Sequence, residues 1–171
     1  EHDPGSCFLL TSSRELVEKV NREIEVQAAR LSRREAIGRA LAGLSAVIYH
    51  ADMGRLVGLA SEFAAEHVNV QTRDAAGVAA RVRHAGAVFI GPMSAVAAGD
   101  YVAGPSHCLP TNTTARFGSG MSVYEFLKRT SLVAYDKQGA MADAAAVRQL
   151  AGAETLDGHA ASMARRERNL L

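Results

Sequence analysis

Strand-like and helix-like segments alternate along the first half of the chain, and this alternation is the strongest constraint on its fold. Such alternation predicts mainly parallel strands with helices as the connections between them. We therefore expect an α/β fold, with a Rossmann-like, mainly parallel sheet and flanking helices. The expected strands lie at 7–13, 45–50, 67–72 and 87–92. The expected helices lie at 14–30, 31–44, 52–65 and 73–86.

Polar residues at the predicted helix starts support these boundaries. Asp52 and Asp74 stand where N-caps are needed, and the 7–13 segment ends in hydroxyl residues that can cap the helix after it. Ser32 is followed three residues later by Glu35, which is the spacing of a capping box. The sequence therefore predicts side-chain caps on several helices.

The composition is ordinary for a globular protein and excludes several classes of function. The chain has 171 residues, of which 48% are hydrophobic and 22% charged, so a core can form. A formal net charge of +1 does not favour nucleic acid or an anionic membrane as a partner. The two cysteines, Cys7 and Cys108, form no Cys-x-x-Cys pair, so a thiolate zinc site is not expected. Without an apolar run near the roughly 20 residues of a membrane span, we expect a cytoplasmic protein.

The pattern changes after the fourth expected strand. Residues 99–120 are rich in glycine, proline and hydroxyl residues and have no periodicity, which is typical of a functional or a disordered loop. A helical turn and a short strand are expected within 122–136, followed by an Ala-rich helical tail that breaks near Gly158. We therefore expect an α/β domain with the loop over 1–121 and a small helical extension over 122–171, which has too little bulk for a core of its own and is expected to dock on another surface.

An adjacent acid and imidazole form the first candidate site. Glu66 and His67 lie at a helix-to-strand junction and could transfer protons near neutral pH. This junction is the amino-terminal edge of a parallel strand, whereas ligands usually collect at the carboxyl edge. A polar helix end that faces water is therefore the alternative interpretation.

Other histidines and one aspartate could bind a metal ion or a substrate. Asp100 and His107 lie seven positions apart in the loop, and both residue types are good ligands for a divalent metal. A capping aspartate and a hydrogen-bonded loop histidine explain the same residues equally well. His2 and His159 are isolated in the sequence, and by position alone each is typical of a surface histidine.

Taken together, four segments resemble the histidinol dehydrogenase family. They appear in the family's order and extend over nearly the whole chain. The long loop is the most specific, with Gly-Asp-Tyr, Gly-Pro-x-His, Leu-Pro-Thr and Ala-Arg-Phe at the family's spacing. The four segments are "AAEHVNV", "AGAVFIGP", "GDYVAGPSHCLPTNTTARFGSGMSVYEFLKRTS" and "AETLDGHAASMARR".

The resemblance implies a reaction and a role for each candidate residue. It implies oxidation of L-histidinol to L-histidine through L-histidinal, in histidine biosynthesis, with two NAD molecules reduced and a zinc ion (Zn2+) that holds the substrate. His67 matches the general base, and Glu66 matches the acid that helps to activate water. No residue of the chain is assigned to NAD. The remaining matches are to zinc ligands, for His2, Asp100 and His159, and to substrate contacts, for His107, Glu154 and His159.

The resemblance also implies partners. Family members are homodimers whose tail helices reach across, so His159 is expected to serve the metal of the neighbouring subunit. The N-terminal half of the enzyme, with a further glutamine ligand before His2, is absent from this chain, which we therefore expect to be inactive alone. Two alternatives stay open: a paralogue that oxidises another small alcohol, and a non-catalytic metal-binding or dimerisation module.

Overall fold

The computed structural model describes residues 5–170, with side chains described as far as Arg168. His2, an expected zinc ligand, lies outside the described residues. The chain forms two compact units, which meet in sequence between Phe126 and Leu127. This junction lies five residues beyond the expected boundary after residue 121. Exchange of the second unit between subunits stays a prediction.

The expected α/β fold is confirmed, with four short strands in the first unit. β1 pairs with β2 and β3 pairs with β4, both in parallel. Within the described residues these are two separately hydrogen-bonded pairs rather than one continuous sheet, so the Rossmann-like detail is not confirmed. The strands are β1 (Phe8–Thr11), β2 (Ala46–Tyr49), β3 (His67–Val70) and β4 (Ala87–Ile90).

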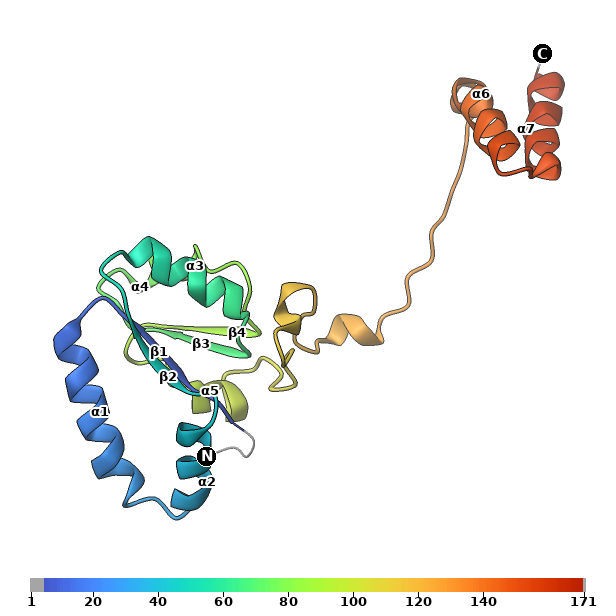
Figure 1. Ribbon diagram of the computed structural model, residues 1–171. Coiled ribbons are helices and arrows are strands. Elements are labelled where there is room, and N and C mark those ends of the chain that lie inside the picture. The colour runs from blue at the N-terminus through green and yellow to red at the C-terminus, as the bar shows by residue number, and fades with distance from the viewer. Residues whose placement is uncertain (1–4, 171) are drawn as a thin grey trace. The chain divides into compact units, whose positions relative to one another are not determined.

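Helices connect the strands and cover both sides of them. Figure 1 shows α3 and α4 on one side of the strands and α1, α2 and α5 on the other. Two 3-10 turns follow, at Thr114–Arg116 and Val123–Phe126. The helices of this unit are α1 (Arg14–Ala28), α2 (Arg34–Ala42), α3 (Met53–Phe63), α4 (Ala75–Ala79) and α5 (Val96–Tyr101).

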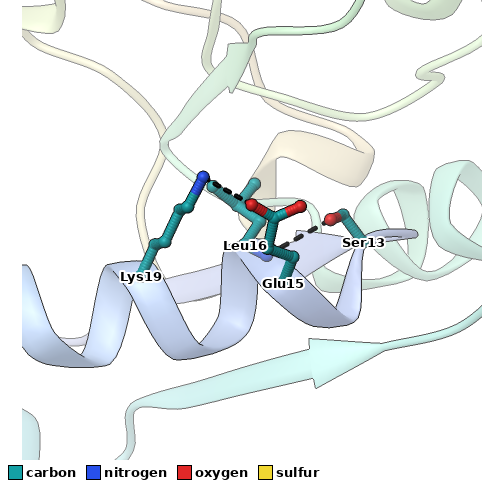
Figure 2. Close-up of polar contacts among 4 residues, drawn as sticks. All are labelled: Ser13, Glu15, Leu16 and Lys19. Carbon is teal, nitrogen blue, oxygen red and sulfur yellow. Dashed lines mark hydrogen bonds and ion pairs between the residues drawn. The ribbon is translucent and has the colours of Figure 1, made fainter.

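Side chains cap three of these helices, largely as the sequence predicts. Figure 2 shows the Ser13 hydroxyl at the start of α1, where it accepts a hydrogen bond from the Leu16 N–H at 3.2 Å. The Glu15 carboxylate lies 2.6 Å from the Lys19 ammonium one turn on, and this hydrogen bond lowers the pKa of Glu15 and raises that of Lys19. Asp52 and Asp74 cap α3 and α4 as expected.

The capping box predicted at Ser32 is wrong. α2 begins at Arg34, and Arg33 stands at the N-cap position without a side-chain hydrogen bond. The turn that ends α1 continues as far as Leu31, whose N–H bonds to the Ala28 carbonyl at 3.3 Å. Ser32 therefore lies in a turn two residues before α2 and not at the N-cap position of that helix.

The helix predicted over 73–86 is much shorter in the structure, because the Arg81 and Val82 N–H groups bond three residues back instead of four. α4 stops at Ala79, and the Arg83 N–H bonds to the Ser61 hydroxyl at 3.1 Å. In a continued helix that N–H would bond to the Ala79 carbonyl, which instead accepts from Val82 at 3.0 Å. A hydroxyl on α3 thus replaces a helical hydrogen bond.

The core of the first unit is small. Leu56, Val57 and Val70 are buried, and the rings of Phe8 and Phe63 stack with centroids 4.4 Å apart. Many large apolar side chains are instead exposed, and Phe117 is an extreme case at 86%. An apolar surface of this kind is typical of a protein–protein contact.

The second unit is an α-helical hairpin. The Asp136 side chain caps α6 (Lys137–Ala153) by accepting from the Gly139 N–H at 2.7 Å. α7 (Asp157–Leu170) packs against it through small buried residues, and an ion pair joins Arg148 and Glu167. Those buried residues are Ala140, Ala144 and Ala151. No helix among the described residues has the length and apolar character needed to span a membrane.

One local prediction in this part of the chain is wrong and another is confirmed. Residues 127–136 form no strand, since no other described segment pairs with them. The helical tail breaks near Gly158 as expected, at 154–156, where Thr155 adopts a left-handed conformation with φ of 58°. Gly158 lies in the first turn of α7, where its missing side chain does not interrupt the helix.

The cap of α1 gives the first testable prediction. Ser13→Ala removes the acceptor for the Leu16 N–H, and we expect the free energy of unfolding to fall by about 1 kcal/mol. Urea unfolding followed by circular dichroism measures the change. Ser12→Ala is the matched control, because Ser12 is also exposed and precedes the cap. An equal loss in both variants would contradict the role of Ser13.

Candidate functional site

The Glu66–His67 pair lies at the junction of α3 and β3, as the sequence predicts. α3 ends at Ala64, which adopts a left-handed conformation and turns the chain toward the strand. The Glu66 carbonyl accepts the Ala87 N–H at 2.8 Å, and the Ala65 carbonyl accepts the Gly86 N–H at 3.0 Å. Parallel pairing with β4 therefore holds the backbone of the acid, while both side chains stay partly exposed.

A carboxylate from another element faces the imidazole. The Asp100 Oδ1 lies 3.7 Å from the His67 Nε2, which is too long for a hydrogen bond. Although 28% of the His67 side chain is exposed, the Nε2 atom itself is buried and has no hydrogen-bond partner among the described residues. Because a buried polar atom normally has a partner, this nitrogen is available to a bound molecule.

The position of Asp100 differs from the one expected. It lies near the end of the short helix α5 and not in the irregular loop. α5 packs closely on β4, since a Cβ at Gly99 would lie 2.6 Å from the Phe89 ring. The same ring lies 6.0 Å, centroid to centroid, from that of His67. Phe89 thus contacts the elements that carry both members of the pair.

The long loop after α5 is ordered against the same edge of the strands. A Cβ at Gly86 would lie 3.2 Å from both Leu109 and Pro110, so the loop rests directly on the glycine before β4. The Cys108 carbonyl accepts the Met121 N–H at 2.9 Å, and the Arg116 guanidinium donates to the Glu62 carbonyl. The loop therefore covers the amino-terminal edge, where a parallel sheet seldom carries its ligands.

The structure joins only some of the predicted site residues. His107 is exposed, and Cys108 is an exposed free thiol. Glu154 and His159 are exposed in the second unit, at the end of α6 and the start of α7. Among the side chains described, no three His, Cys, Asp or Glu residues gather as a metal centre. The roles assigned to all these residues stay predictions.

Sequence reasoning missed the contribution of Phe89 and Gly99. Gly99 stands next to a candidate ligand, and a glycine beside a functional residue is a usable signal of close packing. Nothing local indicates which ring it would meet, because Phe89 lies on a different element.

The parallel strand pairs and the helices that cover them define an α/β protein. The acid–base pair at one strand edge is a candidate site for proton transfer. A sequence model described as histidinol dehydrogenase matches residues 1–167. The chain belongs to the histidinol dehydrogenase family.

Individual relatives agree with this assignment. Histidinol dehydrogenase from Nitratidesulfovibrio vulgaris is 46% identical over 167 residues, and the match covers 97% of this chain and 38% of that protein. The Synechococcus sp. enzyme is 40% identical, with 99% of this chain and 39% of that protein covered. The crystal structure of histidinol dehydrogenase from Elizabethkingia anophelis has a TM-score of 0.87 at 27% identity, and the match covers 96% of this chain and 38% of that chain. The chain thus spans under two-fifths of the length of these relatives.

The contact of the loop with the strand edge gives a second prediction. A Cβ at Gly86 would lie 2.5 Å from the Glu66 carbonyl oxygen, so Gly86→Ala must displace the backbone. We expect the free energy of unfolding to fall by about 1–3 kcal/mol. In the control variant Gly38→Ala, on α2, the new Cβ meets nothing within 4 Å, and helix propensity should stabilise the chain by up to about 1 kcal/mol. Urea unfolding of both variants decides the point, and unchanged stability of Gly86→Ala would contradict the close contact.

Proposed function

We propose that the chain forms the C-terminal part of a zinc-dependent oxidoreductase that converts L-histidinol to L-histidine through L-histidinal, with two NAD molecules reduced. Membership of the histidinol dehydrogenase family supports the reaction class. The observation that carries the proposal is the buried His67 Nε2, which has no hydrogen-bond partner within residues 5–170 and faces the Asp100 carboxylate.

His67 acts as the general base of the first oxidation. Its free Nε2 takes the hydroxyl proton of the alcohol while a hydride leaves the carbon that bears the hydroxyl. The nearby Asp100 carboxylate stabilises the imidazolium that results. An imidazole suits this task because its ordinary pKa lies near neutrality.

Glu66 assists the second oxidation. The aldehyde needs one water molecule to become a hydrate, and loss of a second hydride and two protons from the hydrate yields the carboxylate. Glu66 is partly exposed and precedes the base directly in the chain, so its carboxylate can take a proton from that water. Pairing of its backbone with β4 limits its movement during the reaction.

Zinc fits the residues that are present. The Asp100 side chain is 33% exposed, and a carboxylate has more lone pairs than the contact with His67 uses. Asp100, His159 and His2 together offer the oxygen and nitrogen donors that zinc prefers. The ion, when bound, would fix the imidazole-bearing substrate in position. NAD, when bound, would accept the hydrides, and we assign no residue of this chain to it.

The rest of the site is proposed to come from other residues of this chain, from a second subunit and from an N-terminal part. His107, Glu154 and His159 would contact the substrate, with His159 supplied by the second subunit of a homodimer. Two observations support a further N-terminal part that completes the enzyme. Many large apolar side chains are exposed, and the match covers only 38% of the Nitratidesulfovibrio vulgaris relative. We therefore expect no turnover from the chain alone, and a cytoplasmic location for the complete protein.

An assay of the complete protein, with the N-terminal part that its relatives have, tests the proposal. Zinc, NAD and L-histidinol should give two NADH per L-histidine. Zinc uptake or dimer formation without NADH would favour the non-catalytic module. NADH from another small amino alcohol in preference to L-histidinol would favour a paralogue.

Substitution of the base gives a third prediction. His67→Gln in the complete protein should retain zinc and lower turnover by about 10²–10⁴-fold, because glutamine cannot take the proton. NADH formation and metal analysis on the same sample measure both effects. His50→Gln is the control, because His50 lies at the end of β2 and its Nδ1 accepts the Asp52 N–H. Unchanged turnover in His67→Gln would remove the proposed base.

Substitution of the tail ligand gives a fourth prediction. His159→Ala in the complete protein should weaken zinc binding by at least about tenfold. Titration with a zinc chelator, followed by metal analysis, measures the affinity. Arg165→Ala, an exposed position on the same helix, should bind zinc as the unmodified protein does. Equal zinc affinity in His159→Ala and Arg165→Ala would contradict the ligand role.

A further inference from the structure

A basic groove runs along α3, and none of the residues discussed above as catalytic, substrate-binding or metal-binding lines it. Its volume is about 750 Å³, within the range of small-molecule sites. One wall is a single face of α3, with glycine or serine at three of its positions. That face consists of Gly54, Val57, Gly58, Ser61 and Glu62.

Three arginines, a histidine and Ala80 form the rest of the groove. Arg81, Arg83 and His84 come from the segment between α4 and β4, and Arg116 comes from the long loop. The lining contains a single carboxylate, that of Glu62, so its net charge is +2 when the histidine is neutral. Two segments far apart in sequence therefore bring positive charge to one face of α3.

The arginines are held near the groove but are not neutralised. The Arg83 N–H bonds to the Ser61 hydroxyl at 3.1 Å, which fixes the backbone of this segment on α3. An Arg81 Nη2 lies 4.0 Å from the position that a Cβ at Gly54 would take. Neither Arg81 nor Arg83 has a carboxylate within ion-pair distance in the described part of the chain.

Gly58 keeps the groove open at a cost in helix stability. A Cβ there would meet nothing within 4 Å, so neither packing nor backbone conformation requires glycine. Glycine inside a helix is less favourable than alanine by about 1 kcal/mol. The open groove gives a physical reason for glycine at position 58, because any side chain there would project into the groove.

We propose that this groove binds a small phosphate-bearing molecule. Each guanidinium is a planar fork that donates two parallel hydrogen bonds to phosphate oxygens. The Arg116 guanidinium already donates to the Glu62 carbonyl. The forks of Arg81 and Arg83 together can still donate four hydrogen bonds, and a phosphate offers more oxygens to accept them than the two of a carboxylate, which favours a phosphate ligand. None of the residues proposed for the dehydrogenase reaction lines the groove, so a loss of binding in variants of the groove residues tests this site separately from that reaction.

Calorimetric titration of the 171-residue chain at constant ionic strength tests the site. The probes are inorganic phosphate, ADP and acetate. We expect ADP or phosphate to bind with a dissociation constant of about 1 mM or tighter, and acetate to bind at least about tenfold more weakly. Tighter binding of ADP than of phosphate would identify a nucleotide as the source of the phosphate group. Absence of binding by both phosphate probes, or equal binding of acetate, would overturn the proposal.

Two kinds of variant distinguish a specific binding site from unspecific attraction to positive charge. The double variant Arg81→Gln/Arg83→Gln removes charge, whereas Gly58→Leu fills the groove and keeps every charge. Both should weaken binding by about tenfold or more. The controls are Arg55→Gln, an exposed arginine on α3 outside the groove, and Gly38→Leu on α2, and both should bind as the unmodified chain does.

The outcomes that contradict the site are equally specific. An equal loss in Arg55→Gln and in the double variant would show unspecific attraction and overturn the site. Unchanged binding in Gly58→Leu would show that the ligand does not enter the groove. Circular dichroism confirms the fold of each variant. If Gly58→Leu does not fold, the double variant alone decides, because its exposed side chains do not support the core.

Discussion

The parallel pairing of β3 with β4 is the constraint on which the candidate site depends. It sets His67 opposite Ala87 and holds the Glu66 carbonyl on the Ala87 N–H. The same pairing places Gly86 where the long loop can rest on it. A shift of register by one residue would turn His67 to the other face of the strands, away from Asp100. The site therefore exists only with this pairing intact.

Small residues let the separate elements approach one another. Gly86 admits the loop, Gly99 admits the Phe89 ring, and the hydroxyl of Ser61 accepts the Arg83 N–H beyond the end of α4. The core of this unit contains few large buried side chains, so these close contacts and the strand pairing determine its local geometry. The exposed apolar surface is consistent with a chain that spans 38% of the length of the Nitratidesulfovibrio vulgaris relative.

Features that depend on neighbouring residues in the chain were predicted well. The four strands, the caps at Asp52 and Asp74, and the helix-to-strand junction at Glu66 and His67 all lie where the sequence places them. The errors have a common cause, since each involves residues distant in sequence or a turn with no local signal. α4 ends in a local tight turn, and the expected strand within 127–136 has no partner among the described segments.

The sequence by itself determined the α/β class, most element positions and, through its motifs, the resemblance to the histidinol dehydrogenase family. Periodicity and capping act within one or two turns of chain, so they can be read directly from the order of residues. Only the tertiary structure decided that Asp100 meets His67 and that Arg81 and Arg116 line one groove with α3. Such meetings depend on the packing of whole elements, and no local pattern specifies which of many loops and helices will approach.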